Sequence, residues 1–539
     1  MIDIDRRRLV VGSALGIGAL LLPAGAGLAQ ALTARGFTHN VASGEPGTDS
    51  MLLWTRYVAG AVDGEARLQA EVALDPAFTR IVAGGTERTG AYRDWTVKIT
   101  VDGLKPGTTY YYRFVAPDGS MSPVGRTKTL PEGDVRRFGV AVFSCSNMPL
   151  GWFNAYGHAA ARPDLDLWMH VGDYLYEYGA DHEGDRQVPG RIVTPATEMI
   201  AIADYRLRYA CYRADPDLQR LHQMAPVVAM WDDHESANDS WEGGAQNHQP
   251  AKEGDWNPRR AAAMQVYREW MPVSEEPWKA YQIGSLATLY RTESRLLART
   301  HQADLGPVYG APDEDVAIAA FRDGAWHDPS ATMLGTAQES WLFHGFRGQA
   351  GKTAWQMVGM GTIMGRTRMP ADAVSWLRPD VTPKKALSYR NDVRAAALGL
   401  PMWMDRWDGY PAARARLLTA AQHADTDLVM LSGDSHNAWA YSLVEDGRPA
   451  GVEFAGHGVT SSGIEKDMAA DPRTVARGFV EGNPELKWAD TSQRGYMMID
   501  VTPARVTGEW LFMQTVATRN LGLAGSHRME VQRGRKAFS

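Results

Sequence analysis

The sequence predicts an α/β domain preceded by a smaller all-β domain, and three observations lead to this expectation. After about residue 135, apolar strand-like segments alternate with helix-like stretches, which is the pattern of α/β folds. Before residue 132, apolar and polar residues alternate between closely spaced turns, as in a β-sandwich. The chain has 539 residues, which exceeds the length of one typical domain.

The first 31 residues are predicted to be an export signal and not part of either domain. A run of arginines at residues 6–8 precedes a short apolar stretch at residues 11–22, and small residues follow at 29–31. This order is typical of a cleaved twin-arginine signal, and the stretch is short and Gly-rich for the alternative, a membrane anchor. We therefore expect the twin-arginine export machinery as a partner. The mature protein should be periplasmic or secreted, monomeric, and without integral membrane association.

Residues 36–132 are predicted to form the all-β domain, an immunoglobulin-like or fibronectin-like sandwich. Apolar and polar side chains alternate at residues 68–74 and 95–101, and an aromatic run at residues 110–114 follows a Pro-Gly turn. Domains of this kind usually support a catalytic unit, so no chemistry is assigned here.

Residues 135–539 are predicted to form the α/β domain. Helices are expected at residues 259–270 and 411–424. Between residues 275 and 407 the periodicity is weaker, and we expect helices mixed with long loops that lie over the strand ends. Cys211 stands in a stretch with helical periodicity and is expected to be a buried packing residue.

The composition is that of a globular protein and argues against a mainly nucleic-acid-binding one. Hydrophobic residues make up 44% of the chain and charged residues 22%, and the formal net charge is −7. This acidic balance disfavours a surface for polyanions, so nucleic acid is expected only as a substrate. The two cysteines, Cys145 and Cys211, need not form a disulfide in a chain of this size.

Four apolar segments of the α/β domain end in residues that can bind metal ions. The segments span residues 138–145, 165–173, 227–234 and 428–436. Because ligands bind at the carboxyl ends of the strands in open α/β sheets, we expect these residues to converge. The candidate metal ligands are Cys145, Asp173, Tyr176, Asp233, Asn238, Asp434 and His436.

Each candidate alone also has an ordinary structural interpretation. Aspartate is common in turns such as the one at Asp173, and a lone buried Cys145 would more often be inert. Residues 232–235 could form an exposed acidic loop, because four consecutive ionisable side chains are costly to bury without partners. Four strand ends with the same kind of chemistry instead favour one site for at least two metal ions.

Cys145 and Tyr176 make iron a candidate metal. A cysteine beside a metal ion is deprotonated. Tyr176 follows Asp173 by three residues and could add a phenolate, a hard and strongly donating ligand that favours a trivalent ion such as Fe³⁺. Asp173 could bridge this ion to a second cation.

Several motifs make the chain resemble the PhoD-type alkaline phosphatases and phosphodiesterases of the calcineurin-like metallophosphoesterase superfamily. The resemblance covers nearly the whole mature chain, in order. The motifs that carry it are Phe37-Thr-His-Asn-Val-Ala-Ser-Gly-Glu-Pro46, Leu53-Trp-Thr-Arg56, Phe143-Ser-Cys-Ser146, Gly172-Asp-Tyr-Leu-Tyr-Glu177, Trp231-Asp-Asp-His-Glu235, Leu334-Gly-Thr-Ala-Gln-Glu-Ser-Trp-Leu342 and Ser432-Gly-Asp-Ser-His-Asn437.

This resemblance implies a four-layer α/β sandwich and a site that holds Fe³⁺ and Ca²⁺. Matched by position, the implied iron ligands are Cys145, Asp173, Tyr176 and His436. Asp173 would bridge to calcium. The further calcium ligands would be Asp434 and either Asn238 or Asp233.

The resemblance also implies three catalytic residues, His234, Asp173 and Arg295. His234 matches the position expected to contact the phosphate or to protonate the leaving group. Residues 291–295 read Arg-Thr-Glu-Ser-Arg where a Leu-Asp-Thr-Arg pattern is expected, but Arg295 itself is retained and could orient the phosphate.

The function implied is that of an exported, metal-dependent phosphoric-ester hydrolase. It would be an alkaline phosphatase with phosphodiesterase activity, acting through metal-activated hydroxide on small phosphate esters or diesters. An alternative with the same chemistry is a phospholipase D-like or polymer-directed phosphodiesterase. An alternative from another class is an exported binding protein with a structural metal, although structural sites usually fill their coordination sphere with protein ligands.

Overall fold

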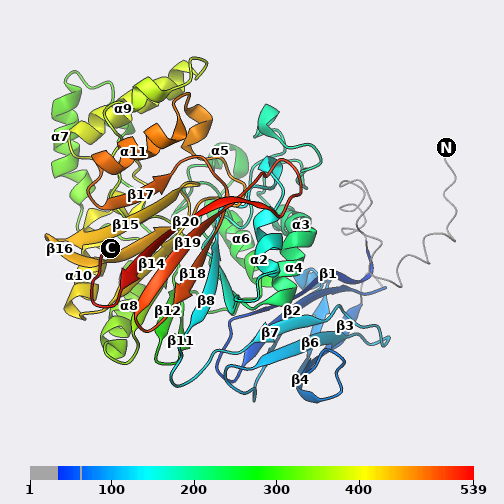
Figure 1. Ribbon diagram of the computed structural model, residues 1–539. Helices are drawn as coiled ribbons and strands as arrows, with labels where there is room; N and C mark the ends of the chain where they lie inside the picture. Colours follow the sequence, from blue (N-terminus) through cyan, green and yellow to red (C-terminus); the bar gives the residue numbers. More distant parts are fainter. Residues whose placement is uncertain (1–33, 61–63) are drawn as a thin grey trace, which may run out of the picture.

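The computed structural model describes residues 34–60 and 64–539, and this part of the chain folds into three β-sheets flanked by helices (Figure 1). The predicted α/β class is confirmed, together with a β-rich N-terminal region. The predicted signal, residues 1–31, lies outside the described residues. Among the helices described, none is both long and apolar enough to cross a membrane.

The largest sheet has nine strands and includes strands from both predicted domains. Its central strands β8, β9 and β10 are parallel to one another, and β18 to β20 extend the sheet antiparallel beyond β8. In spatial order the strands are β20 (Leu523–Gln532), β19 (Arg505–Met513), β18 (Gly495–Val501), β8 (Phe138–Phe143), β9 (Leu167–His170), β10 (Val227–Ala229), β1 (Gly36–Gly44), β2 (Met51–Val58) and β5 (Thr96–Val101).

The second sheet has seven strands. Strands β12, β13, β14 and β16 are parallel, and three antiparallel pairings complete the sheet: β11 with β12, β15 with β16, and β17 with β15. Their spatial order is β11 (Lys279–Ile283), β12 (Ala287–Arg291), β13 (Trp355–Gly359), β14 (Leu428–Ser432), β16 (Arg448–Ala455), β15 (Ala438–Glu445) and β17 (Leu486–Asp490).

Three hydrophobic cores hold these two sheets and the helices together. Val142 of β8 and Met357 of β13 belong to the core between the sheets. Helices α2, α3, α4 and α6 pack on the outer face of the nine-stranded sheet, and α8, α10 and α11 pack on the outer face of the other. The helices are α2 (Asn154–Ala160), α3 (Ile202–Arg213), α4 (Pro216–Met224), α5 (Pro250–Glu253), α6 (Trp256–Trp270), α7 (Glu314–Asp323), α8 (Gly335–Gln349), α9 (Pro383–Ala397), α10 (Pro411–His423) and α11 (Pro472–Gly482).

The segment between residues 275 and 407 differs from its prediction. It contains the helices α7, α8 and α9, as expected, but it also supplies β11, β12 and β13. These strands are only five residues each, and buried polar residues interrupt the apolar pattern of β12 and β13. Gln356 in β13, for example, accepts a hydrogen bond from the Tyr290 hydroxyl of β12 at 2.8 Å. A polar pair satisfied across two strands cannot be recognised in either strand alone.

The predicted helices near residues 259–270 and 411–424 are confirmed as α6 and α10. Cys211 lies in α3 and is 1% exposed, so its predicted role as a packing residue is confirmed as well. Both cysteines are free thiols.

The N-terminal region has its own core but shares a sheet with the rest of the protein. Strands β4 (Ile81–Gly90), β3 (Glu65–Ala73), β6 (Thr109–Val115) and β7 (Gly125–Lys128) form a four-stranded sheet whose apolar side chains pack on those of β2 and β5. Strand β1 pairs in parallel with β10 at Gly44 and Val227. A Cβ on Gly44 would lie 2.1 Å from the Pro272 carbonyl oxygen, so only glycine permits this junction.

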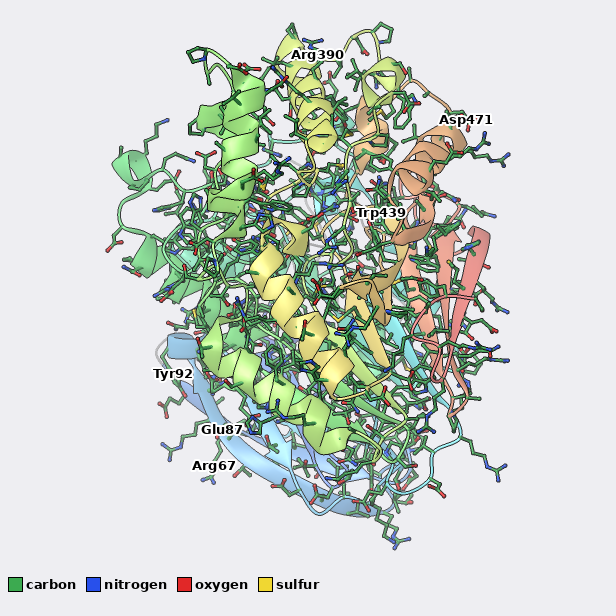
Figure 2. All side chains as sticks on the ribbon, turned by 90° about the vertical axis from the view of Figure 1, so that its left-hand side faces the viewer. Arg67, Glu87, Tyr92, Arg390, Trp439 and Asp471 are labelled. Carbon is green, nitrogen blue, oxygen red and sulfur yellow. The ribbon has the colours of Figure 1, made fainter. Side chains whose placement is uncertain are left out.

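The outer surface of the four-stranded sheet is polar. Figure 2 shows Arg67, Glu87 and Tyr92 on the outside of this region. Arg67 and Glu87 are exposed residues of neighbouring strands, while the alternate residues of β3, such as Leu68, are buried. This alternation is what the sequence predicted for a half-buried sheet, and the immunoglobulin-like description stays a prediction.

Candidate metal centre

The residues that follow four strands converge at one place, but the strands belong to two sheets. Strands β8, β9 and β10 lie in the nine-stranded sheet, whereas β14 lies in the seven-stranded sheet. Ligand atoms of Cys145 (after β8), Asp173 (after β9) and His436 (after β14) lie within 4.8 Å of one another. From the sequence we expected these residues to meet at the edge of one open sheet. In the structure they meet where the strand ends of two packed sheets come together.

Two glycines allow these strand ends to approach each other. A Cβ on Gly172 would lie 2.3 Å from the Cβ of Asp232, and a Cβ on Gly433 would lie 2.5 Å from the Cβ of Ser144. Gly172 also has a φ of 109°, which side chains disfavour. The motifs Gly172-Asp173 and Gly433-Asp434 therefore place a carboxylate directly beside each close contact.

Four of the predicted ligands have left-handed backbone conformations. The φ angles are 59° at Cys145, 55° at Asp173, 65° at Asp434 and 63° at His436. Non-glycine residues rarely adopt this conformation, and the strain it carries concentrates at functional sites. We infer that the backbone is held in this form to direct the four side chains into a shared space.

One half of the site, called here the cysteine end, consists of Cys145, Asp173, Tyr176 and His436. The Tyr176 hydroxyl lies 2.9 Å from Oδ2 of Asp173 and 3.1 Å from Nε2 of His436. Nδ1 of His436 lies 2.8 Å from the Ser462 carbonyl oxygen, to which it donates, so Nε2 keeps its lone pair. The structure thus brings together all four residues that were predicted to bind iron.

The other half, called here the carboxylate end, consists of Asp233, Asp239, Asp405 and Asp434. Carboxylate oxygens of Asp233, Asp239 and Asp405 lie within 4.8 Å of one another, and Asp434 forms such a group with Asp232 and Asp233. Sequence reasoning missed Asp239 and Asp405. Asp239 directly follows the predicted ligand Asn238 and could have been noticed, whereas no strand or turn signal marks Asp405.

Asn238 and Asp233, the two alternatives for a calcium ligand, both lie at the carboxylate end. Oδ1 of Asn238 accepts a hydrogen bond from the Tyr178 hydroxyl at 3.1 Å. The Asp233 carboxylate accepts the backbone N–H groups of His234 at 3.0 Å and Asp239 at 2.7 Å. Carboxylate and amide oxygens have two lone pairs each, so both alternatives are compatible with the geometry.

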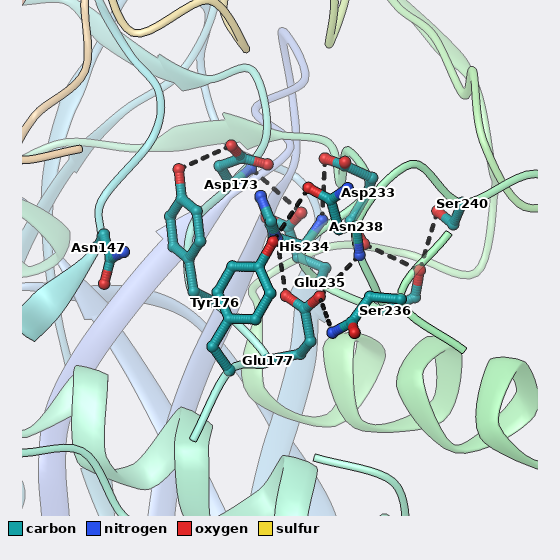
Figure 3. Close-up of polar contacts among 12 residues, drawn as sticks. Asn147, Asp173, Tyr176, Glu177, Asp233, His234, Glu235, Ser236, Asn238 and Ser240 are labelled. Carbon is teal, nitrogen blue, oxygen red and sulfur yellow. Dashed lines mark hydrogen bonds and ion pairs between the residues drawn. The ribbon is translucent and has the colours of Figure 1, made fainter. Parts of the chain in front are cut away.

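His234 is oriented by a buried carboxylate (Figure 3). Its Nδ1 lies 2.7 Å from Oε2 of Glu177, and its ring lies 4.1 Å from the Tyr176 ring, centroid to centroid. Burial lowers the pKa of His234, but the carboxylates of Asp233 and Glu177 outweigh this effect and raise the pKa well above its ordinary value. Because Nδ1 is engaged by Glu177, Nε2 is the ring nitrogen that remains for a substrate. No role for Glu177 was predicted from the sequence.

The Arg295 guanidinium is taken up by carboxylates of the protein, so its contacts give no support to the phosphate-orienting role expected from the sequence, which stays a prediction. The Arg295 side chain is fully buried. Nε and Nη2 donate to the two oxygens of Asp232 at 2.6 and 3.0 Å, and Nη1 donates to Asp405 at 2.8 Å. The geometry makes Arg295 a positioning residue that orients these two carboxylates and balances their charge.

The donors of the cysteine end fit a metal ion. Burial raises the pKa values of Cys145, Asp173 and Tyr176 well above their ordinary values, and it lowers the pKa of His436 to about 3. Oδ1 of Asp173 is buried without a hydrogen-bond partner among the described residues. A cation would satisfy this oxygen and would stabilise the ionised forms that burial disfavours.

The carboxylate end opens into a cleft of about 810 Å³. Asn238, Asp239, Asp405, Asp434 and His436 are among its lining residues, whereas Cys145 and Tyr176 are not. Helix α9 contributes Lys385 and Tyr389 to the lining of the same cleft. A buried group of metal-type donors at the ends of two sheets, open to one cleft, defines a candidate metal site in an α/β enzyme.

Comparison with known proteins identifies the family. The family model described as PhoD-like phosphatase matches residues 140–510, and that of the PhoD-like phosphatase N-terminal domain matches residues 23–131. The chain is 32% identical over 507 residues to alkaline phosphatase D of Bacillus subtilis (strain 168), an alignment that covers 89% of this chain and 78% of that protein. The chain belongs to the PhoD-like phosphatase family and is a phosphoester hydrolase.

Solved structures agree with this assignment. A structure of PhoD superposes with a TM-score of 0.76 at 29% identity, over 94% of this chain and 92% of that one. The purple acid phosphatase PPD1 from yellow lupin (Lupinus luteus) superposes with a TM-score of 0.55 at 12% identity, over 92% of this chain and 74% of that one. The second likeness concerns the fold alone.

Proposed function

We propose that the protein is an exported alkaline phosphatase that also cleaves phosphodiesters, with Fe³⁺ at the cysteine end and Ca²⁺ at the carboxylate end. The observation that carries this proposal is the convergence of Cys145, Asp173, Tyr176 and His436 beside a second group made only of carboxylates. The name of the Bacillus subtilis relative, alkaline phosphatase D, supports the alkaline activity. Export through the twin-arginine machinery, a periplasmic or secreted location and a monomeric state remain part of the proposal.

Donor chemistry supports two different metals. The cysteine end offers sulfur, phenol and imidazole donors, which suit a transition metal, whereas the carboxylate end offers oxygen alone, which suits Ca²⁺. Asp173 has its unpartnered Oδ1 available and lies in one group with Cys145 and His436 and in another with Asp233 and His234. It is therefore the residue best placed to bridge two ions.

The protein's own residues then divide the work of hydrolysis. When bound, the metal ions would lower the pKa of water and neutralise phosphate oxygens. His234 would hold a proton on Nε2 near the leaving-group oxygen, and Glu177 would keep the ring in place through Nδ1. Arg295 would hold Asp232 and Asp405 in position.

The cleft favours substrates larger than a simple monoester. At about 810 Å³ it extends from Asp434 and His436 to α9, which leaves room for a second group on the phosphate. Phospholipids and polymers with phosphodiester links therefore stay alternative substrates. Membership of a phosphatase family favours an enzyme over a non-catalytic binding protein.

The test is to purify the exported protein, measure bound iron and calcium, and assay a nitrophenyl phosphate monoester and the corresponding bis-ester from pH 6 to 10. We expect both metals, hydrolysis of both substrates, and activity that persists or rises at alkaline pH. An iron-free and fully active protein would contradict the iron assignment. Hydrolysis of the monoester alone would contradict the diesterase activity.

A further inference from the structure

Arg406 is a buried arginine whose guanidinium is not paired in the described part of the chain. The residue directly precedes the short 3-10 helix Trp407–Gly409 and is 2% exposed. Its Nη1 is fully shielded and has no hydrogen-bond partner among the described residues. A buried guanidinium with an unsatisfied N–H group is costly unless a ligand completes it.

Two neighbouring buried arginines, unlike Arg406, are paired with carboxylates. Arg295 donates to Asp232 and Asp405, and Arg299 donates to Asp405 through Nη2 at 2.5 Å. Nη1 of Arg299 also lacks a partner among the described residues, but its guanidinium as a whole is paired, whereas that of Arg406 is not. Arg406 is adjacent to Asp405 in sequence but is not part of this network. Asp405 is engaged by the other two arginines, and no described carboxylate forms an ion pair with Arg406, so its charge remains available to an anion from outside.

The Arg406 guanidinium lies over the ring of Trp403. The Cζ atom of Arg406 lies 3.8 Å from the centre of the Trp403 ring. Stacking uses the face of the guanidinium and leaves its N–H groups free at the edge, where they can donate two parallel hydrogen bonds. This is the geometry in which arginine recognises phosphate oxygens.

Arg406 and Trp403 line the same cleft as Asp434 and His436. A cation on the cleft side of a carboxylate cluster is where an anionic substrate gains most, since the carboxylates alone would repel it.

We propose that Arg406, held by Trp403, binds the non-bridging oxygens of the substrate's phosphate group at the entrance to the carboxylate end. This inference rests on the proposed function. It gives Arg406 the phosphate-binding role that the sequence had suggested for Arg295. Its ligand class is a phosphate monoester or diester, and inorganic phosphate as the product. A merely structural role, as a counter-charge stacked on Trp403, is the alternative.

The test compares Arg406→Met, Arg406→Lys and the control Arg390→Met in the metal-loaded, full-length protein. Arg390 is an exposed arginine on α9 (Figure 2). Binding of inorganic phosphate is measured by titration calorimetry, and kcat and KM are measured with the nitrophenyl esters. We expect Arg406→Met to weaken phosphate binding about 100-fold and to lower kcat/KM by about 10²–10³-fold, the range seen when one donor to a developing oxyanion is removed. Arg406→Lys should recover part of both, and Arg390→Met should change neither.

Metal content and thermal melting of each variant separate the outcomes. If Arg406→Met keeps its metals and binds phosphate as the wild type does, the inference is overturned while the proposed function stands. If Arg406→Met does not fold, Arg406→Lys decides, because it keeps the charge and loses the two-pronged donor geometry: unchanged phosphate affinity and kcat/KM in this variant would overturn the inference. Failure of the wild type to hydrolyse any phosphate ester, with phosphate still bound through Arg406, would instead overturn the proposed function.

Discussion

The two ends of the site are built from similar residues but differ in closure and in charge balance. At the cysteine end, Cys145, Asp173 and Tyr176 are each at most 3% exposed, only His436 borders the cleft, and the described arginines form no ion pair with these four residues. At the carboxylate end, Asp239, Asp405 and Asp434 are half-buried and border the cleft.

Among the described residues of the two ends, only those of the carboxylate end form ion pairs with arginines. Arg295 and Arg299 both pair with Asp405, and Arg406 faces the cleft nearby. Fixed cations reduce the repulsion among the carboxylates and also the affinity of this end for a metal ion. A nearly closed end such as the cysteine end suits a tightly bound ion. An open, partly neutralised end such as the carboxylate end suits an ion that binds more weakly and is also contacted by the substrate.

Substitution of Asp173 should have the largest effect, because it removes the residue common to both ends. Asp173→Asn is expected to lower kcat by at least about a thousandfold and to reduce the content of both metals. The measurement is kcat together with iron and calcium analysis. The matched control is Asp181→Asn, at an exposed aspartate. A folded Asp173→Asn variant with both metals and normal activity would show that the two ends are independent.

Substitution of Tyr176 should affect the cysteine end alone. Tyr176→Phe removes the phenol that contacts Asp173 and His436, and we expect loss of the visible absorption band of iron-bound tyrosinate. The kcat should fall by about 10- to 100-fold, and the calcium content should be unchanged. Tyr92→Phe, at an exposed tyrosine, is the control. A band that survives in Tyr176→Phe would assign it to another ligand.

Substitution of Asp405 should have the smallest effect and should be confined to the carboxylate end. Asp405→Asn removes one negative charge and the ion-pair partner of Arg295 and Arg299. We expect about tenfold weaker calcium binding in a calcium titration of activity, with the visible band and the iron content unchanged. Asp102→Asn, at an exposed aspartate, serves as the control. Loss of iron in Asp405→Asn would mean that the two ends do not bind metals separately.

Much of the candidate site could be predicted because its residues follow recognisable strands. Cys145, Asp173 and Asp434 each come directly after an apolar segment, and a side chain in that position lies at the end of a strand in any α/β fold. The strands β11 to β13 could not be predicted in the same way, since each has only five residues and, in β13, the buried polar Gln356 is satisfied by Tyr290 of the neighbouring β12.

Residues from segments without such signals were missed. Asp405 and Arg406 precede a short 3-10 helix, and Asp405 is held at the site by Arg295 and Arg299, which lie more than 100 residues earlier in the chain. Arg295 shows the opposite case, because the sequence located it correctly near the site but could not show which atoms its guanidinium contacts. Its guanidinium donates hydrogen bonds to Asp232 and Asp405, which lie 63 and 110 residues away in the sequence.

The sequence by itself determined the fold class, the strand-end motifs and the chemical type of the donors, because these depend on local periodicity and on residue identity. Only the tertiary structure decided that the motifs come from two packed sheets, that β1 extends the central sheet through Gly44, and that Arg406 rather than Arg295 faces the cleft. These features depend on contacts between segments far apart in the chain. Such contacts are selected by close packing and by the pairing of buried charges, neither of which leaves a pattern in any single segment.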